Sequence, residues 1–242
     1  MHWESCSISD RGLVRANNED AVLDRPDASL WAVADGMGGH AAGEIASRLA
    51  IDVLERGLTE RPNGTDVSGW LRTTFTSANA VIRAHGKAVA ETRGMGTTLT
   101  VLAASIGAAG VIAHVGDSRA YRIRAGTMEQ LTRDHTWVQE RIDAGLLTST
   151  QAREHPFASV LTRVLGMDIT VAPDLFDVSV EPGDVYLLCS DGLTGMVSVD
   201  EIQRLLVHSD SLRGIVDNLV GAAKSNGGLD NISLVVLRAS AD

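Results

Sequence analysis

Acidic side chains stand beside several runs that have the pattern of buried strands. Four aspartates share this position: Asp35 after WAVA, Asp117 soon after VIAHV, Asp191 soon after VYLLC, and Asp230 shortly before ISLVVL. Each aspartate alone is typical of a turn. Carboxylates gathered at one end of a sheet, however, repel one another and are costly to desolvate, so they need a counter-charge. The pattern favours a hard divalent cation such as Mg²⁺ or Mn²⁺, which prefers oxygen ligands.

A further acidic pair and a glycine extend this pattern. Glu19 and Asp20 come just before a short apolar run, and Gly36 follows Asp35. A glycine there allows its backbone carbonyl to approach an ion as well. Residues 38–43 have the glycine spacing of a phosphate-binding loop, but Glu-Ile follows where Lys and Ser or Thr are required. The sequence also lacks the DxDxDG string of a calcium-binding EF-hand loop.

The elements that must position these groups are short strands and long amphipathic helices. Apolar or alternating runs predict strands over residues 6–9, 30–34, 98–105, 111–115, 120–124, 175–180, 185–189 and 232–237. Helical spacing predicts helices over 41–58 and 67–85, and two more near the C-terminus, the first opened by a capping box from Ser198 to Glu201. Two consecutive helices between strands break regular β-α-β alternation, so antiparallel sheets covered by helix pairs are expected.

The polar stretch from 133 to 168 interrupts this order. It has helical spacing over Trp137, Val138 and Ile142 and no strong strand pattern. We expect it to fold as a small flap on the main body rather than to serve as a linker. A chain of 242 residues commonly forms one domain. The expected organisation is therefore a single domain over 1–242 that contains the flap.

Composition and charge narrow the class of protein. Lys and Arg number 21 against 31 Asp and Glu, and the formal charge of −10 disfavours nucleic acid as a partner. The weakly polar run 99–116 is split by GAAG, which predicts two strands and not a membrane span. Cys6 and Cys189 form no zinc or disulfide pattern, and the N-terminus has no signal-like pattern. Reduced thiols and a cytoplasmic location are therefore expected.

Eight short motifs follow one another along the chain. They are SDRGLVR at 9–15, NED at 18–20, ADGMGGH at 34–40, GMGTT at 94–98, VGDSR at 115–119, DH at 134–135, LCSDGL at 188–193 and DN at 230–231. In number and order they resemble the motif series of the metal-dependent protein phosphatases, the protein phosphatase 2C type. The resemblance covers nearly the whole chain and is strongest to stand-alone bacterial catalytic domains.

This resemblance implies an α+β fold, a four-layer αββα sandwich of two antiparallel β-sheets flanked by helix pairs, with a small flap subdomain. Two Mn²⁺ or Mg²⁺ ions are expected to be held, directly or through water, by Glu19, Asp35, the Gly36 carbonyl, Asp191 and Asp230. Asp20 is expected to support these ligands, and Asp117 with Asp191 to hold a third, weaker ion. Arg15 is expected to receive the substrate phosphate, because its planar fork can donate to two phosphate oxygens.

The resemblance also implies a protein serine/threonine phosphatase. Water activated by the two cations attacks phosphorus directly in this chemistry, and no phosphoenzyme forms. Phosphorylated proteins and an opposing bacterial serine/threonine kinase are the expected partners. The chain is expected to act as a monomer, without inserting into a membrane. We expect the flap to affect the choice of substrate more than the chemical step.

The resemblance leaves the general acid and the roles of the histidines undecided. Met37 stands where eukaryotic relatives place a histidine, and His40 comes three residues later. His40 is either a general acid for the leaving oxygen or a residue that orients its loop, and a metal-bound water is the alternative acid. His114 lies in an apolar run and is expected in the core, and His135 is expected to position the flap. Arg119 is expected to anchor the Asp117 loop.

Other functions remain as alternatives. A cysteine-dependent tyrosine phosphatase is disfavoured, because neither cysteine has an arginine six positions later. Another two-metal phosphoesterase is an alternative that the motif series disfavours. A catalytically inactive module that keeps this fold to bind a kinase is a different class. The presence of every expected carboxylate argues against that module.

Overall fold

The structure, a computed structural model, describes residues 1–38, 42–60, 66–104, 109–207 and 211–241, and every structural statement below concerns these ranges. The strands are β1 (His2–Asp10), β2 (Asp20–Arg25), β3 (Leu30–Met37), β4 (Gly96–Thr97), β5 (Leu99–Ala104), β6 (Ala109–Val115), β7 (Arg119–Arg124), β8 (Thr127–Gln130), β9 (Asp174–Ser179), β10 (Val185–Cys189) and β11 (Ile232–Ser240). The helices are α1 (Ala42–Thr59), α2 (Val67–Ala88), α3 (Trp137–Asp143), α4 (Ser149–Arg153), α5 (Asp191–Thr194), α6 (Val199–Val207) and α7 (Leu212–Ser225).

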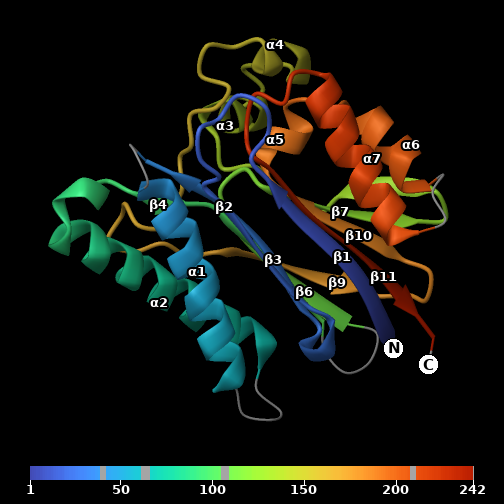
Figure 1. Ribbon diagram of the computed structural model, residues 1–242, viewed down its shortest axis with the longest axis horizontal. Coiled ribbons are helices and arrows are strands. Elements are labelled where there is room, and N and C mark those ends of the chain that lie inside the picture. The colour runs from blue at the N-terminus through green and yellow to red at the C-terminus, as the bar shows by residue number, and fades with distance from the viewer. Residues whose placement is uncertain (39–41, 61–65, 105–108, 208–210, 242) are drawn as a thin grey trace.

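The strands form two antiparallel sheets. One sheet has the order β1-β11-β10-β7-β8, and the other has the order β2-β3-β5-β6-β9 with β4 paired to β3. Every pairing between named strands is antiparallel. The chain ends lie side by side at one end of the sandwich, since His2 pairs with Ser240 (Figure 1).

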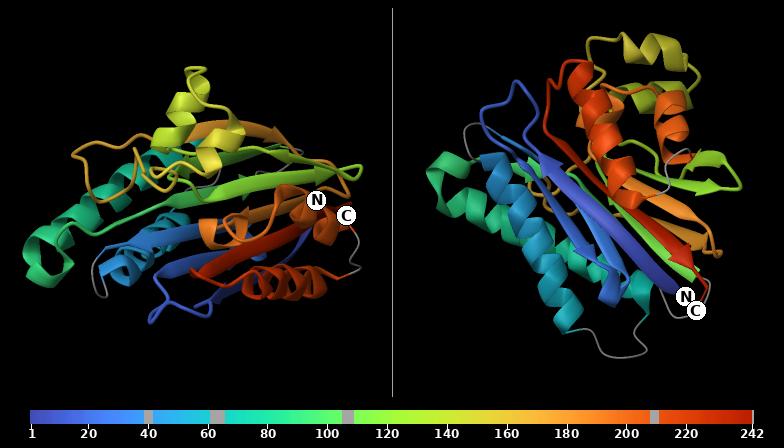
Figure 2. Two further views of the ribbon diagram at one scale, coloured as in Figure 1. Left: turned by 90° about the horizontal axis from the view of Figure 1, so that it is seen from above. Right: turned by 45° about the vertical axis from the view of Figure 1, so that its right-hand side comes forward.

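Side chains of the central strands are buried on both faces, which explains why the sheets stack. In β3, Trp31 and Val33 join the apolar cluster between the two sheets, whereas Leu30, Ala32 and Ala34 join the cluster beneath α1 and α2. The strands β10 and β11 divide their residues in the same way between the inter-sheet cluster and the cluster beneath α6 and α7. The resulting layers are helices, sheet, sheet and helices (Figures 1 and 2). The expected αββα sandwich is confirmed.

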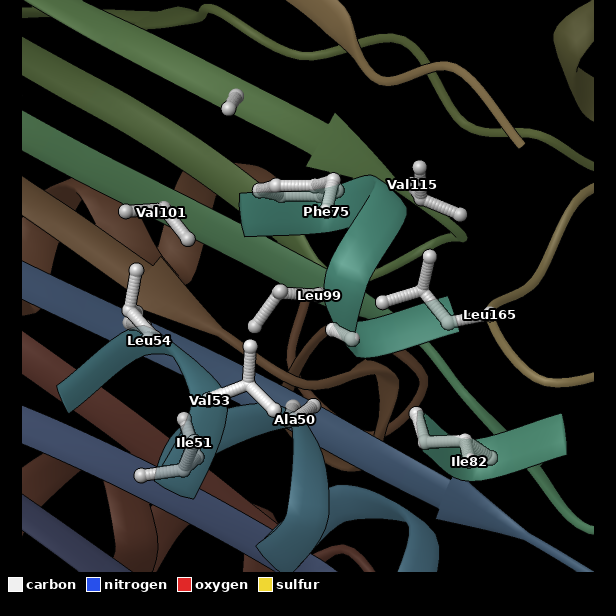
Figure 3. Packing of buried hydrophobic residues seen from close by; sticks show 14 of the residues in the cluster. Ala50, Ile51, Val53, Leu54, Phe75, Ile82, Leu99, Val101, Val115 and Leu165 are labelled. Carbon is white, nitrogen blue, oxygen red and sulfur yellow. The ribbon is translucent and has the colours of Figure 1, made fainter. Parts of the chain in front are cut away.

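The helix pair α1 and α2 packs closely on its sheet. Leu54 from α1 and Phe75 and Ile82 from α2 are fully buried against Leu99 and Val101 of β5 (Figure 3). The side-chain carboxylate of Asp66 accepts hydrogen bonds from the backbone N–H groups of Ser68 and Gly69 and so caps the start of α2. This packing holds the sheet that carries Asp20 and Asp35.

The structure corrects two expectations about strands. The strand at 30–34 does not end at Asp35 but continues to Met37, because Gly36 and Met37 pair with β4. The strands β2, β4 and β8 were not expected from the sequence pattern. Each pairs with a neighbouring strand, β2 and β4 with β3 and β8 with β7.

The segment from 133 to 168 contains only the short helices α3 and α4, and it stands at the end of the sandwich away from the chain termini (Figure 1). This agrees with the helical spacing seen there, while a separate role for it stays a prediction. The GAAG turn expected at 107–110 lies partly outside the described residues. Cys6 and Cys189 are both free thiols. No helix in the described ranges is long and apolar enough to cross a membrane.

Candidate metal centre

A cavity of about 240 Å³ opens at the end of the sandwich where several strands begin or end. It is lined by Arg15, Glu19, Asp35, Gly36, Met37, Gly38, Thr98, Asp117, Ser159, Leu161, Asp191, Asp230 and Asn231. The cavity therefore brings together every residue predicted to bind a metal ion, together with the arginine predicted to bind phosphate. Their roles stay predictions.

Strand pairing explains this convergence. Asp20, at the start of β2, lies opposite Asp35 near the end of β3. On the other sheet, β10 ends just before Asp191, and its antiparallel neighbour β11 begins just after Asp230. Asp117 lies in the turn from β6 to β7, which belong to different sheets. Acidic groups from both sheets thus meet at one rim.

The backbone of Asp35 is fixed, which leaves its side chain as the group that faces the cavity. Its N–H donates to the Thr98 hydroxyl at 2.9 Å, and its carbonyl accepts from the Thr98 N–H at 2.9 Å and the Thr97 hydroxyl at 2.9 Å. The Thr98 hydroxyl also bonds to the Ser118 hydroxyl at 2.8 Å. Thr98 therefore ties Asp35 to the turn that carries Asp117.

Gly36 has a steric reason to be a glycine, in addition to the one that the sequence suggests. A Cβ there would lie 2.1 Å from the Gly43 carbonyl oxygen and 2.5 Å from the Glu19 carbonyl oxygen. The start of α1 and the start of β2 both approach it too closely for a side chain. The glycine thereby lets Glu19 lie beside the N-terminal turn of α1, whose partial positive charge favours a carboxylate. Its carbonyl as an ion ligand stays a prediction.

Burial and mutual repulsion raise the pKa values of the acidic groups. Burial raises the pKa of Asp117 to about 8, and the Asp191 charge adds to this shift. Burial and the charge of Asp20 hold the pKa of Asp35 well above its ordinary value. The pKa of Asp191 is raised by burial and by Asp230, and that of Glu19 is raised mainly by burial. This cavity therefore favours protons or cations as partners for its carboxylates.

Asp20 lies beneath the cavity wall and not in it. Its Oδ2 accepts a hydrogen bond of 2.9 Å from the Ser190 hydroxyl, whereas its Oδ1 is buried without a hydrogen-bond partner. Burial raises the pKa of Asp20 to about 7. A buried carboxylate oxygen without a partner is costly. Its placement fits the supporting role predicted from the sequence.

Arg15 supplies positive charge at the cavity. Its Nη2 donates to Asp230 Oδ2 at 2.6 Å, and this bond raises the pKa of Arg15. Within the described ranges, no three Asp, Glu, His or Cys side chains already surround one point as metal ligands do. Asp230 Oδ2 is bonded to the arginine, and the carboxylates of the site would have to turn to surround an ion.

Asn231 is a site residue that sequence analysis left without a role. Its Nδ2 donates to the carbonyls of Arg11 and Asn17, each at 2.9 Å, and its Oδ1 accepts from the Glu19 N–H at 2.8 Å. These bonds hold the segment between β1 and β2, which carries Arg15 and Glu19. Its position next to Asp230 was the signal that could have identified it.

Of the remaining predicted residues, His40 lies outside the described residues, whereas His114, His135 and Arg119 lie within them. His114 is fully buried in the core, as expected, and His135 stacks on it with 4.8 Å between ring centroids. His135 also accepts a hydrogen bond of 3.0 Å from the Gly116 N–H. Arg119 makes a two-pronged ion pair with Asp134, at 2.9 and 2.7 Å, which agrees with an anchoring role.

The sequence and the fold are both similar to known proteins. The sequence profile of Protein phosphatase 2C matches residues 14–232. The serine/threonine protein phosphatase PstP of Mycobacterium tuberculosis is 42% identical over 228 residues, which are 94% of this chain and 43% of that protein. The chain thus spans less than half the length of PstP. The serine/threonine phosphatase stp of Listeria welshimeri is 38% identical over 95% of this chain and 93% of its own length.

One of the similar solved structures contains bound metal ions. The crystal structure of the catalytic domain of the serine/threonine protein phosphatase PstP, in complex with two manganese ions, superimposes with a TM-score of 0.90. It shares 38% sequence identity, and the match covers 99% of each chain.

Proposed function

Because this chain belongs to the protein phosphatase 2C family, we propose that it is a metal-dependent protein serine/threonine phosphatase. Its reaction is the hydrolysis of phosphoserine and phosphothreonine on proteins. The observation that carries this proposal is the convergence of four aspartates, Glu19 and Arg15 on one cavity. The names of the relatives, serine/threonine phosphatases from two genera, support the same reaction.

The residues at the cavity fit two divalent cations. The donor set is entirely oxygen, the repelling carboxylates outnumber the two arginines whose charges reach them, Arg15 and Arg119, and Asp20 keeps an unpartnered buried oxygen. The two-manganese complex of PstP supports this fit. The residues that would hold two Mn²⁺ or Mg²⁺ ions are Glu19, Asp35, the Gly36 carbonyl, Asp191 and Asp230. Asp117 with Asp191 would hold a third ion.

The residues at the cavity have separate roles in the proposed reaction. Two cations bound at this site would supply a water activated for attack on phosphorus and positive charge for the phosphate oxygens. Arg15, half-exposed at the cavity mouth, receives the phosphate through its two parallel N–H groups and releases Asp230 as it does so. Thr98 and Ser118 keep the Asp35 and Asp117 backbones in place. Protonation of the leaving oxygen is assigned to His40 or to a metal-bound water.

The cellular role is part of the proposal. The phosphatase opposes a bacterial serine/threonine kinase by acting on the phosphoproteins that the kinase produces. It acts as a monomer. Its location is the cytoplasm, where the two cysteines stay reduced. The flap at 133–168 affects which phosphoproteins enter, since Ser159 and Leu161 of this segment line the cavity.

The test is turnover of a phosphothreonine peptide with and without Mn²⁺, together with calorimetric titration of Mn²⁺. Asp35→Asn and Asp191→Asn each remove charge from the ion-binding set, so each should lower activity and Mn²⁺ affinity by about 100-fold or more. Asp177→Asn, an exposed aspartate on β9, is the matched control and should change neither. Turnover that does not depend on metal would refute the proposal. Folded protein that binds Mn²⁺ without turnover would instead favour the inactive binding module.

A further inference from the structure

Three exposed apolar side chains flank the ion pair at the cavity mouth. Leu13 is 61% exposed, Val14 is 64% exposed and Leu229 is 55% exposed. Val14 directly precedes Arg15, and Leu229 directly precedes Asp230. We call Leu13, Val14 and Leu229 the apolar ridge. Two of its three members are thus the immediate neighbours of the two residues whose side chains form the ion pair.

The ridge is assembled from two segments that are far apart in sequence. The Leu13 N–H donates to the Gly228 carbonyl at 2.8 Å. A Cβ on Gly228 would lie 3.0 Å from Leu13 Cγ, and a Cβ on the adjacent Gly227 would lie 3.5 Å from Leu229 Cγ. Figure 1 shows the loop after β1 beside the segment that leads into β11. Leu13 therefore lies against Gly228, and Leu229 lies against the neighbouring Gly227.

Hydrogen bonds fix the first segment so that it cannot fold its apolar side chains inward. Asn231 holds its two ends at Arg11 and Asn17. Asp10 accepts from the Gly12 N–H at 2.8 Å and pairs with Lys224 at 2.7 Å. Gly12 has a φ of +74°, and a Cβ there would lie 2.1 Å from the Asp230 carbonyl oxygen. The turn therefore requires a glycine at this position, where the backbone passes close to Asp230. The exposure of the ridge is built into the fold.

The flap also has exposed apolar residues next to residues that line the cavity. Ser159 and Leu161 line the cavity, and the residue between them, Val160, is 44% exposed. Phe157, two residues before Ser159, is 51% exposed. Exposed apolar residues thus lie next to cavity-lining residues on three segments of the chain, at 13–14, 157–160 and 229. Such clustering at a site marks a surface that binds an apolar partner.

We infer that the apolar ridge binds an apolar side chain next to the phosphoserine or phosphothreonine of the substrate, an inference that rests on the proposed function. A phosphate held at Arg15 brings the neighbouring substrate residues, 3.8 Å apart along the chain, within reach of Val14, Leu13 and Leu229. Burial of the ridge and of the substrate side chain removes apolar surface from water on both partners. The ridge thereby selects phosphorylation sites with apolar neighbours over those with polar neighbours.

The experiment compares kcat/KM for two phosphothreonine peptides of equal length, one with leucines and one with serines on both sides of the phosphothreonine. The wild-type enzyme should prefer the leucine peptide by about tenfold, and Leu13→Ser combined with Leu229→Ser should reduce that ratio to about twofold. Because both peptides are assayed with the same protein sample, the ratio of their kcat/KM values does not depend on the fraction of active protein. Ile169→Ser combined with Val207→Ser is the matched control. These residues are 78% and 43% exposed, and neither they nor the described residues next to them in the chain line the cavity, so the ratio should stay at about tenfold.

Each outcome decides between the two proposals. A small aryl phosphate, assayed with the wild type and Mn²⁺, reports the proposed function separately. Turnover of the aryl phosphate without a preference between the peptides overturns the ridge alone. An unchanged ratio in the Leu13 and Leu229 variant, or an equal fall in the control variant, also overturns it. No turnover of any substrate removes the proposed function and the ridge with it.

Discussion

Asn231 shows how much of the site depends on one neutral side chain. It is 5% exposed, and its amide makes three hydrogen bonds to the backbone of the segment that carries Arg15 and Glu19. Removing one partner of a buried hydrogen bond leaves the other without compensation, which costs more than the bond itself contributes. The effect of this residue on phosphate binding therefore passes through backbone position and not through contact with substrate.

Asn231→Ala should lower the free energy of unfolding by about 3 kcal/mol, because it leaves two carbonyls and one N–H without partners. It should also raise KM for a small aryl phosphate more than it lowers kcat, because Arg15 loses its fixed position. Urea unfolding and steady-state kinetics measure the two effects. Asn226→Ala, an exposed asparagine with a single bond to the Met196 carbonyl, is the control and should cost about 1 kcal/mol. Equal losses in both variants would contradict a special role for Asn231.

Acidic residues of the site could be predicted from the sequence, but their neutral supports could not. Asp35, Asp117 and Asp191 stand out because a charge beside an apolar run is costly unless something neutralises it. Thr98 and Asn231 have no such contrast, since hydroxyl and amide groups are common in any turn. Which backbone groups they hold depends on contacts between distant segments. Only the fold supplies those contacts.

Helix α2 covers, together with α1, the sheet bearing Asp20 and Asp35, and Phe75 is the largest buried side chain of α2 (Figure 3). Phe75→Ala should lower the free energy of unfolding by about 3–5 kcal/mol, because the close-packed layer leaves a cavity. The measurement is urea or thermal unfolding. Phe157→Ala on the flap, where the ring is 51% exposed, should cost about 1 kcal/mol or less. Similar losses would mean that α2 does not anchor the sheet.

Strands with strong apolar patterns were predictable, whereas two strands at sheet edges were not. β10 was predicted at its observed bounds, because all five of its residues are buried. β8 is mostly exposed and is held by a tight turn at Ala125 and Gly126, both with positive φ. β2 has charged residues at both ends and gains its register from β3. Edge strands depend on pairing with a neighbour, which the pattern of their own side chains does not reveal.

At the scale of the whole molecule, the sequence indicated buried sheets and helix pairs but not their stacking. The strands β3, β10 and β11 are apolar on both faces, which predicts cover on both sides. Whether a helix or a second sheet supplies each cover depends on topology. The four-layer order therefore came from the resemblance to a family, and the inter-sheet cluster around Trp3, Trp31 and Tyr186 is its physical cause.

The buried histidine of β6 makes the stability of the whole fold depend on pH. His114 donates from Nε2 to the Arg133 carbonyl at 3.1 Å, bonds to the Thr100 hydroxyl at 2.9 Å, and stacks on His135. Burial lowers its pKa to about 3, and the nearby His135 adds to this effect while Asp174 opposes it. In the unfolded chain, histidine has a pKa of about 6.5. Below that pH the unfolded state therefore binds a proton that the folded state does not.

The free energy of unfolding should consequently fall as pH drops from about 6.5 towards 3, by about 1.4 kcal/mol per pH unit from this group alone. His114→Gln removes this dependence. The stability lost in the variant should be about 2 kcal/mol smaller at pH 5.0 than at pH 7.5. Urea unfolding at the two pH values measures the difference, and carboxylates that titrate in both proteins cancel. Asn79→Ala, a buried polar residue that does not titrate, should lose the same stability at both pH values. An equal cost of His114→Gln at both pH values would show that His114 takes up a proton in the folded protein.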